Sequence, residues 1–456
     1  MPSATPRSAL AIRPRPSELQ DEPPPRKLKH APCTSLPDNS PLAGFSPVQL
    51  PSNHAEERPP KRPMPTPSKT IAVVNSSGRQ AASFIRVASA VGYHVRAQLR
   101  NLDGIVATEI SELPNVTAIV GDLYTKISPT STASPNLGPG GVGVNHELIT
   151  DLFRGAQLAF INTTFWGDEI AIGKALADAA VKANIQHYIY STMPNHSLHN
   201  ENWPSLPLWS SKASIESYIR SLPTLAPKTS YIYTGIYNNN FTSLPYPLFC
   251  MELQTDGSFI WQAPFHPDVK LPWLDAEHDV GAAVLQLFKD GVRKWGHGNR
   301  IALAYEMLSP REACRAFAKG VGRPVRYRRG KIDIKVKIPN GYRDQLVALE
   351  KMYELGAKDK GLQPPYFGEQ DLEDSCPEEA LALWEGYRGL EEYAREVFPL
   401  EEAANGLTWM NEEEDGRIEG GEDEADAEGE DDDDDEGLTI GGGAETPARK
   451  EESWLA

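Results

Sequence analysis

The sequence predicts an α/β fold with a doubly wound parallel sheet at its centre. Two observations lead to this prediction. Short apolar runs rich in β-branched residues alternate with longer segments of helical periodicity between residues 71 and 194. The first of these runs is followed by a turn of small and polar residues that leads directly into a helical pattern. Regular alternation of strands and helices most readily builds a parallel sheet that is covered by helices on both faces.

The two ends of the chain differ in composition from its middle. Residues 1–68 contain 17 of the 39 prolines and no sustained periodicity, so they bury too little surface to fold. Residues 412–436 contain 17 acidic residues against one arginine, which accounts for −16 of the formal net charge of −18. We therefore expect disordered tails at 1–68 and 411–456, and a nearly neutral folded core at 69–410.

The turn after the first predicted strand, Ile71–Val74, has features of a dinucleotide site. The residues NSSGRQ are followed by Ala81, where a helical pattern begins. Asn75 and Ala81 stand at the first and third glycine positions of G-x-x-G-x-x-G, and only Gly78 is retained. A strand, a tight turn and a helix present backbone amides to a pyrophosphate. An ordinary strand-to-helix turn is the alternative.

The second predicted strand, His94–Asn101, follows a helix expected over Ala82–Gly92. An NAD-selective site carries an acidic residue about 20 residues after the glycines, where it binds the ribose hydroxyls. Here the strand ends in Arg100, and an arginine can accept the 2′-phosphate of NADP. A site built this way is not expected to select strictly for NAD. A solvent-exposed arginine is the alternative.

The next segments continue the alternation of strands and helices. Val116–Leu123 and Ala156–Thr164 are predicted strands that end in small or polar residues, where an open parallel sheet binds its ligands. Thr125–Asn145 is rich in Pro, Gly, Ser and Thr and is expected to be a flexible insertion. Asp168–Ile185 has an apolar helical face, and Gln186–Pro194 is predicted to form a fifth strand.

The region after the fifth predicted strand is where a catalytic tyrosine and lysine would stand. A short-chain dehydrogenase carries Y-x-x-x-K there, because the phenol donates a proton while the lysine lowers the phenol pKa and holds the ribose. Lys212 begins a helix, but Leu208 stands at the tyrosine position, and leucine has no proton to donate. The sequence thus predicts dinucleotide binding without the usual phenol, with Lys212 at the ribose hydroxyls. A simple surface lysine is the alternative.

Four later segments allow two interpretations each. Tyr233–Phe249 is either a rigid binding surface or a loop that covers the edge of the sheet. Leu271–Phe288 contains acidic residues and a histidine, and we favour an acidic first helical turn over a metal site. Arg323–Pro339 is predicted to be a strand with one solvated face rather than a nucleic-acid contact. Glu378–Pro399 is predicted to be a helix that packs against the core, and the alternative is that an exposed part of it binds a basic partner protein.

Composition also bears on the compartment and on partners. The four cysteines have no metal-ligand or redox spacing, and no apolar run is long enough for a signal peptide or a membrane span. We expect an intracellular, reducing compartment. Two basic clusters in the N-terminal segment, PPPRKLKH and RPPKRP, favour entry into the nucleus, although they also fit a solvated tail. Direct DNA binding is not expected, because the sequence has no zinc motif or basic helix-turn-helix.

Eight separated stretches together resemble the NmrA-like family, whose fold is similar to that of the short-chain dehydrogenases. The resemblance covers about residues 69–410 and leaves out both tails and the 125–145 segment. The stretches are NSSGRQAAS, HVRAQLR, FINTT with GDEIAIGKALADAA, QHYIYSTMP, YTGIYNNNFTSLPYPLF, LPWLDAEHDVG and YAREVFPLEEAANGL.

The resemblance implies a fold and a function. It implies an atypical Rossmann domain, mainly at 69–240, and a smaller, mainly partner-binding α/β subdomain at 241–410. It implies a transcriptional co-repressor, in the nucleus and the cytoplasm, that binds a GATA-type zinc-finger activator and silences nitrogen-catabolic genes. NAD or NADP would then be a ligand that reports redox state, without turnover.

The resemblance also implies cofactor contacts at matching positions. The family's regulatory members likewise lack tyrosine where Leu208 stands, and some carry threonine where Ser77 stands, so a hydroxyl is retained. The implied contacts lie in the pyrophosphate turn, near the adenosine ribose, beyond the fourth strand and at the nicotinamide end. They are Asn75, Ser77, Gly78, Arg79, Gln80, Arg100, Asn162, Thr163, Lys212, Tyr237 and Asn238.

An enzyme remains the alternative hypothesis. A reductase of the isoflavone-reductase kind would use Lys212 without an upstream tyrosine, since burial lowers the pKa of an amine and favours its neutral form. Leu208 weakens this interpretation.

Overall fold

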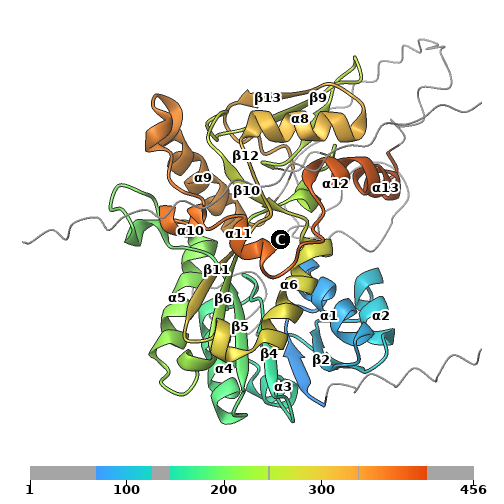
Figure 1. Cartoon of the computed structure of the whole chain (residues 1–456), viewed down its shortest axis with the longest axis vertical. Helices are drawn as coiled ribbons and strands as arrows, with labels where there is room; N and C mark the ends of the chain where they lie inside the picture. The colour runs from blue at the N-terminus through green and yellow to red at the C-terminus, as the bar shows by residue number, and fades with distance from the viewer. Residues whose placement is uncertain (1–67, 126–142, 245–246, 337, 408–456) are drawn as a thin grey trace, which may run out of the picture. The chain divides into compact units, whose positions relative to one another are not determined.

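The computed structural model describes residues 68–125, 143–244, 247–336 and 338–407 (Figure 1). Residues 1–67, the acidic segment and residues 126–142 of the predicted insertion lie outside this part of the chain. The expectations about those segments therefore remain predictions.

A sheet of seven strands forms the centre of the fold, in the order β11-β6-β5-β4-β1-β2-β3. Every pair of neighbours is parallel. This arrangement confirms the predicted doubly wound α/β fold. The strands are β1 (Thr70–Val73), β2 (His94–Leu99), β3 (Val116–Val120), β4 (Leu158–Ile161), β5 (His187–Thr192), β6 (Thr229–Thr234) and β11 (Asn299–Leu303).

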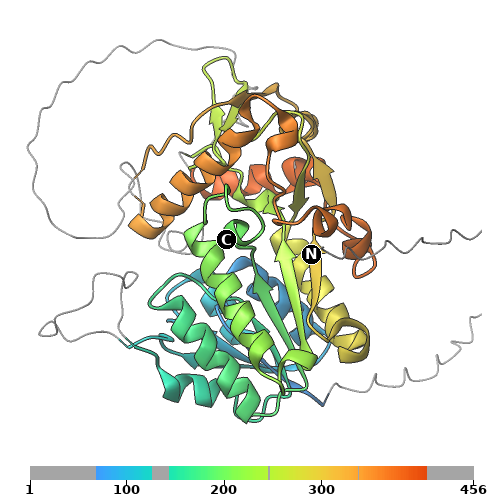
Figure 2. The ribbon, with the colours of Figure 1, turned by 90° about the vertical axis from the view of Figure 1, so that its left-hand side faces the viewer.

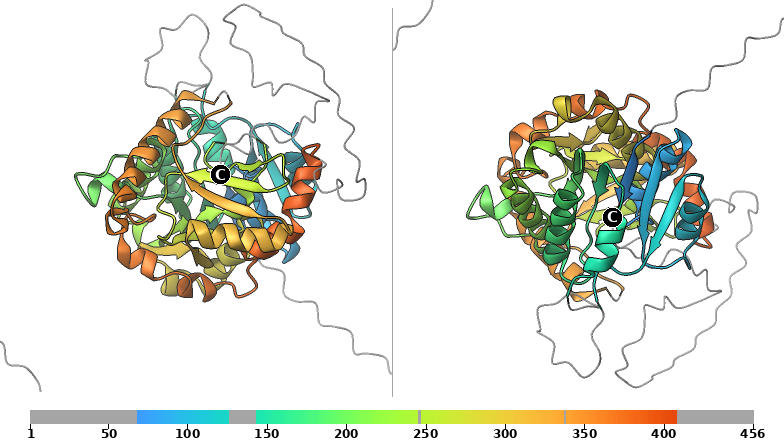
Figure 3. Two further views of the ribbon diagram at one scale, coloured as in Figure 1. Left: turned by 90° about the horizontal axis from the view of Figure 1, so that it is seen from above. Right: turned by 90° about the horizontal axis from the view of Figure 1, so that it is seen from below.

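Helices cover both faces of this sheet, as Figures 2 and 3 show. Successive side chains of a strand point to opposite faces. Ile71 and Val73 accordingly pack against the helix pair α1 and α6, whereas Ala72 and Val74 face α3, α4 and α5. The helices are α1 (Arg79–Ala90), α2 (Ile105–Glu112), α3 (His146–Leu152), α4 (Glu169–Lys182), α5 (Pro207–Ser221), α6 (Ala276–Asp290) and α7 (Val292–Trp295).

Two small sheets make up the rest of the fold together with helices α8 to α13. One has the order β12-β10-β7 and the other β13-β9-β8. Their strands are β7 (Ile236–Tyr237), β8 (Met251–Leu253), β9 (Phe259–Ala263), β10 (Leu271–Leu274), β12 (Glu306–Leu308) and β13 (Val325–Arg329). The helices are α8 (Pro310–Val321), α9 (Asn340–Glu354), α10 (Gln370–Asp374), α11 (Glu378–Leu381), α12 (Leu390–Glu396) and α13 (Phe398–Ala404).

Five short 3-10 helices complete the list of helices. They are η1 (His196–Leu198), η2 (Ala226–Lys228), η3 (Asn238–Asn240), η4 (Leu355–Ala357) and η5 (Lys360–Leu362).

A cluster of buried aromatic rings joins the two small sheets to α8 and α13. Phe241 stacks on Trp273, with ring centroids 5.5 Å apart, and contacts Trp261 and Phe317, which in turn contacts Phe398.

The second half of the chain also contributes to the central sheet. Strand β11 pairs with β6, with Asn299 opposite Ser230, and α6 packs against α1. A division at residue 240 therefore does not separate two independent sheets. The chain leaves the central sheet after β6, forms β7 to β10, and returns to it through α6, α7 and β11.

The predicted helix over Glu378–Pro399 is wrong, because the segment contains α11, α12 and the start of α13. Two glycines, Gly386 and Gly389, lie between α11 and α12. The backbone N–H of Arg388 donates to Asp279 Oδ1 at 3.1 Å, so it bonds to another element rather than to a helical carbonyl. Tertiary hydrogen bonds thus replace helical ones in this connection.

Two other downstream predictions have definite outcomes. Asp275 caps α6 and accepts hydrogen bonds from the backbone of Glu277 and His278, so the acidic first turn is confirmed. Among the described residues, no group of His, Cys, Asp and Glu is placed to hold a metal ion. In the basic segment only Val325–Arg329 forms a strand, with Arg326 and Arg328 exposed on one face.

None of the helices in the described part of the chain is long and apolar enough to cross a membrane.

The contact between α1 and α6 gives a testable prediction. A Cβ on Gly281 would lie 2.5 Å from the backbone oxygen of Ser83, which cannot move away cheaply. We expect Gly281→Ala to lower the free energy of unfolding by about 1–3 kcal/mol, the usual cost of overpacking. Urea denaturation measures the change. In the matched control, Gly341→Ala in α9, the added methyl group meets open space, so stability should be unchanged or slightly higher. Equal effects of the two substitutions would contradict the prediction.

Candidate dinucleotide site

Two neighbouring cavities lie at the carboxyl ends of the central strands, where open parallel sheets bind ligands. The larger has a volume of about 150 Å³ and the smaller about 40 Å³. Asn162, Thr163 and Thr164, which follow β4, line both cavities. The two cavities therefore meet along one segment of backbone.

The turn between β1 and α1 forms one side of the smaller cavity. Asn75 has a left-handed backbone with φ of 53°, which asparagine tolerates better than most residues. Gly78 precedes the first turn of α1, and its N–H donates to the Asn75 carbonyl at 2.9 Å. A Cβ on Gly78 would lie 2.6 Å from Asn75 Nδ2. A side chain at position 78 would therefore have to displace the Asn75 side chain.

Gln98 on β2 holds this turn in place, a role that the sequence analysis missed. Its side-chain oxygen accepts from the Asn75 N–H at 3.0 Å, and its amide donates to the Gly121 carbonyl at 2.8 Å. The residue is 2% exposed. Gln98 alternates with the apolar residues of β2 as His94 and Arg96 do, so nothing in the local pattern sets it apart.

Arg100 and Trp166 line the smaller cavity together with Ser77. The Arg100 guanidinium lies over the Trp166 ring, 5.4 Å from its centroid. This stacking places a cation and an aromatic surface beside the turn, near the position predicted for the adenosine ribose. The buried indole N–H of Trp166 has no hydrogen-bond partner among the described residues. Sequence analysis identified Arg100 but not Trp166.

Lys212 points into the larger cavity and does not lie on the open surface, since its side chain is 17% exposed. Its Nζ lies 3.2 Å from Asn162 Oδ1 and 3.3 Å from Glu169 Oε1, and it also donates to the Thr163 carbonyl. The Thr163 hydroxyl donates to Glu169 at 2.7 Å. Lys212 and Glu169 thus form an ion pair at the end of β4, and each balances the charge of the other.

Gln80 and Tyr237 meet at the other side of this cavity. The Gln80 side-chain N–H donates to the Tyr237 hydroxyl, which lies 3.3 Å from Thr234 Oγ1. Burial raises the pKa of Tyr237, so its phenol stays protonated. The first turn of α1 is therefore bonded to β7, which belongs to a small sheet.

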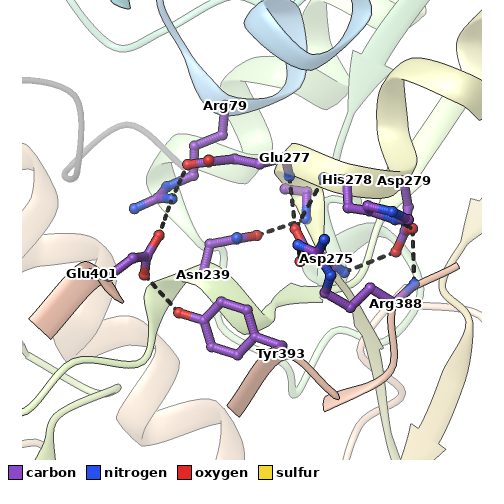
Figure 4. A network of polar contacts seen from close by, with 10 residues as sticks. Arg79, Asn239, Asp275, Glu277, His278, Asp279, Arg388, Tyr393 and Glu401 are labelled. Carbon is purple, nitrogen blue, oxygen red and sulfur yellow. Dashed lines mark hydrogen bonds and ion pairs between the residues drawn. The ribbon is translucent and has the colours of Figure 1, made fainter. Parts of the chain in front are cut away.

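Three of the predicted contact residues, Gly78, Arg79 and Asn238, line neither cavity. The Arg79 side chain turns towards α6 and α13, where it pairs with Glu277 and lies 3.8 Å from Glu401 (Figure 4). Asn238 is fully buried, and its side-chain amide has no hydrogen-bond partner in the described part of the chain. Arg79 lies at the turn because α1 begins there, but its guanidinium contacts Glu277 and Glu401 and not the cavities.

A network of buried charges continues from Arg79 (Figure 4). Arg388 lies 3.2 Å from Asp275, and His278 is bonded to Asp279 at 2.7 Å. Burial raises the pKa of Asp279, and the hydrogen bond to Asp279 raises the pKa of His278. The network attaches the C-terminal segment to α6 and thereby to the turn.

Side chains from the second half of the chain cover the larger cavity. They come from α9 and from the segment before α10, and include Tyr342, Leu346 and Tyr366. Leu208, at the position where a catalytic tyrosine would stand, also lines the cavity. The second half of the chain therefore forms one wall of the larger cavity.

A model described as the NmrA-like family matches residues 67–394 of this chain. The chain belongs to the NmrA-like family. It is 62% identical over 416 residues to the nitrogen metabolite repression protein nmr of Neurospora crassa, which covers 90% of this chain and 84% of that protein. It is 51% identical over 370 residues to nmrA of Emericella nidulans, covering 75% of this chain and 98% of that protein.

Solved structures of the NmrA-like family agree with the fold. A crystal structure of NmrA, described as a negative transcriptional regulator, is 53% identical, with a TM-score of 0.66. It covers 75% of this chain and 99% of its own. Structures of NmrA in complex with NAD and with NADP are each 54% identical, with the same TM-score and coverage.

Glu373 supports the segment that covers the larger cavity in this NmrA-like chain. Its carboxylate accepts a hydrogen bond from the Phe367 N–H at 3.3 Å, next to Tyr366. Burial raises the pKa of Glu373 to about 7 from an ordinary value of 4.5. The folded protein therefore binds this proton more readily than the unfolded chain, and the stabilisation is present below pH 4.5 and lost as the pH rises through 7.

We expect Glu373→Gln to remove this pH dependence, because the amide does not ionise. As the pH rises from 4 to 8, the free energy of unfolding of the variant should increase by about 3 kcal/mol relative to that of the natural protein. Urea denaturation at several pH values measures the difference. Exposed Glu378 provides the control Glu378→Gln, for which the curves should stay parallel. If the curves of unfolding free energy against pH are parallel for Glu373→Gln and the natural protein, burial does not raise the pKa of Glu373.

Proposed function

We propose that this protein is a negative regulator of nitrogen-catabolic transcription that binds NAD or NADP without turnover. The observation that carries the proposal is the turn at residues 75–80, where Gly78 leaves no room for a side chain and the first turn of α1 contains no acidic residue. Helix N-terminal amides and the helix dipole favour a pyrophosphate at such a turn. The complexes of NmrA with NAD and NADP support the same assignment.

The residues of both cavities fit the two halves of a dinucleotide. In the smaller cavity, the indole N–H of Trp166 lacks a partner among the described residues, and Arg100 offers a cation. None of the residues that line this cavity is acidic, so a 2′-phosphate meets no carboxylate there. Binding of both NAD and NADP is therefore expected.

Two features support binding without turnover. Leu208 cannot donate a proton to a reacting carbonyl. Lys212 is held by Glu169, Asn162 and Thr163, so its N–H groups are directed at protein acceptors.

A reductase that uses Lys212 is the second candidate, because the amine does lie in the larger cavity. For lysine to act as an acid or base near neutral pH, its environment must lower its pKa by burial or nearby positive charge. In this structure Lys212 Nζ lies 3.3 Å from the Glu169 carboxylate and contacts Asn162 and Thr163. These protein partners argue against proton transfer to a ligand by Lys212.

Calorimetric titration of the full chain with NAD, NADH, NADP and NADPH tests the binding proposal. We expect saturable binding of dinucleotide, and loss of that binding in Gly78→Trp, since the indole would displace Asn75 from the turn. Ile105→Trp is the control, because Ile105 is 70% exposed on α2 and its substitution should leave the affinity unchanged. Oxidation of NADPH by a range of ketones and quinones would support the reductase, and no binding at all by the folded chain would refute the site.

We infer that the partner is a GATA-type zinc-finger activator, which the protein meets in the nucleus and the cytoplasm. The names of the nmr and nmrA relatives, nitrogen metabolite repression proteins, support a regulatory partner. Glu391 and Glu396 on α12 are half-exposed carboxylates that each pair with Arg395, and a basic zinc finger would compete with this arginine for them.

A purified GATA-type zinc-finger domain, titrated against the full chain, tests this inference. We expect saturable binding that weakens as salt is added, and an affinity lowered several-fold by Glu396→Lys, because charges at the edge of an interface act through long-range attraction. A zinc finger of the Cys2His2 class is the control partner. Equal binding of both fingers, or none, would contradict the inference.

A further inference from the structure

We propose that Gln80 selects the ring substituent of the dinucleotide, so that a carboxamide binds in the larger cavity in preference to a carboxylate. This inference rests on the proposed function, because it assigns a role to one residue of the same site. It moves Gln80 from the pyrophosphate turn, where the sequence placed it, to the nicotinamide end.

The first observation is a buried acceptor without a donor. Gln80 is 4% exposed and lines the larger cavity from the first turn of α1. Its side-chain N–H bonds to Tyr237, but its oxygen has no hydrogen-bond partner among the described residues. Leaving a buried acceptor unpaired costs free energy, which a ligand N–H at this position would offset.

The second observation is that the Gln80 amide N–H faces the Tyr237 hydroxyl, which has Thr234 as a second partner. The phenol oxygen accepts from the amide N–H, and Thr234 Oγ1 lies 3.3 Å away on the other side. Tyr237 belongs to β7, which pairs with β10, so its position is set by the small sheet. The amide nitrogen is therefore turned to Tyr237 and the carbonyl is left for the ligand.

The third observation concerns charge in the same cavity. Glu169 compensates Lys212 at 3.3 Å, and the ammonium also contacts Asn162 and Thr163. The charge of Lys212 is therefore already balanced by Glu169, and it is not left to pair with an anionic ring substituent. A carboxylate would place its oxygens opposite the Gln80 carbonyl, and neither group could donate a proton. A carboxamide supplies an N–H donor for the Gln80 carbonyl.

Calorimetric titration of the full chain with three compounds tests this proposal. NAD carries a carboxamide, nicotinic acid adenine dinucleotide carries a carboxylate, and ADP-ribose lacks the ring and measures the rest of the site. We expect NAD to bind at least about tenfold more tightly than the acid analogue, a factor that corresponds to 1.4 kcal/mol.

Variants assign this preference to Gln80. In Gln80→Leu, which keeps a similar volume without an acceptor, the ratio of the two affinities should fall towards one. Tyr237→Phe removes the hydroxyl that the amide N–H faces and should reduce the ratio in part. Gln286→Leu on α6 makes the same exchange at a glutamine whose side chain bonds to Asp290, and it should retain the full ratio.

Three results would overturn the proposal. The first is equal affinity for NAD and the acid analogue in the natural protein. The second is tighter binding of the acid analogue, which would mean that the amide N–H faces the ligand. The third is a ratio in Gln80→Leu as large as in Gln286→Leu. If neither NAD nor ADP-ribose binds, the proposed function fails together with this inference, so the two failures are distinguishable.

Discussion

The close packing of α1 against α6 is the contact on which the rest of the structure depends. The helices approach because Gly281 has no side chain, and the Gly281 N–H donates to Ser83 Oγ at 3.0 Å. Helix α1 begins at the dinucleotide turn, whereas α6 belongs to the half of the chain that also forms the small sheets. This contact therefore places the turn relative to everything that covers the larger cavity.

Buried charges reinforce the same placement. Arg79 pairs with Glu277 on α6 and lies near Glu401 on α13, and Arg388 contacts Asp275 at the start of α6. Asp275 is fully buried beside Arg388, and the partly buried Arg79 is likewise paired with Glu277, as ionic groups removed from water require. The consequence for function is that the arginine of the turn supports the fold, and the backbone amides of α1 are left for the pyrophosphate.

The two cavities differ in chemistry although they share Asn162, Thr163 and Thr164. The smaller one offers the Arg100 guanidinium stacked on Trp166. In the larger one the Lys212–Glu169 pair is compensated, and uncharged groups such as Gln80 and Tyr237 face the ligand. Such an arrangement suits recognition of a neutral ring more than proton transfer.

The sequence by itself determined the parallel sheet, the position of the turn, the acidic cap of α6 and the absence of a tyrosine at position 208. These features depend on local periodicity and on single residues, which a sequence displays directly. Only the tertiary structure decided that β11 returns to the central sheet, that the segment around Gly389 is not one helix, and that Arg79 turns away from the cavities. It also decided the roles of Gln98, Trp166 and Glu169, because each acts on a residue that is distant in sequence or lies on another element. Pairing of a buried polar group is a property of three-dimensional neighbours, and no local pattern encodes those neighbours.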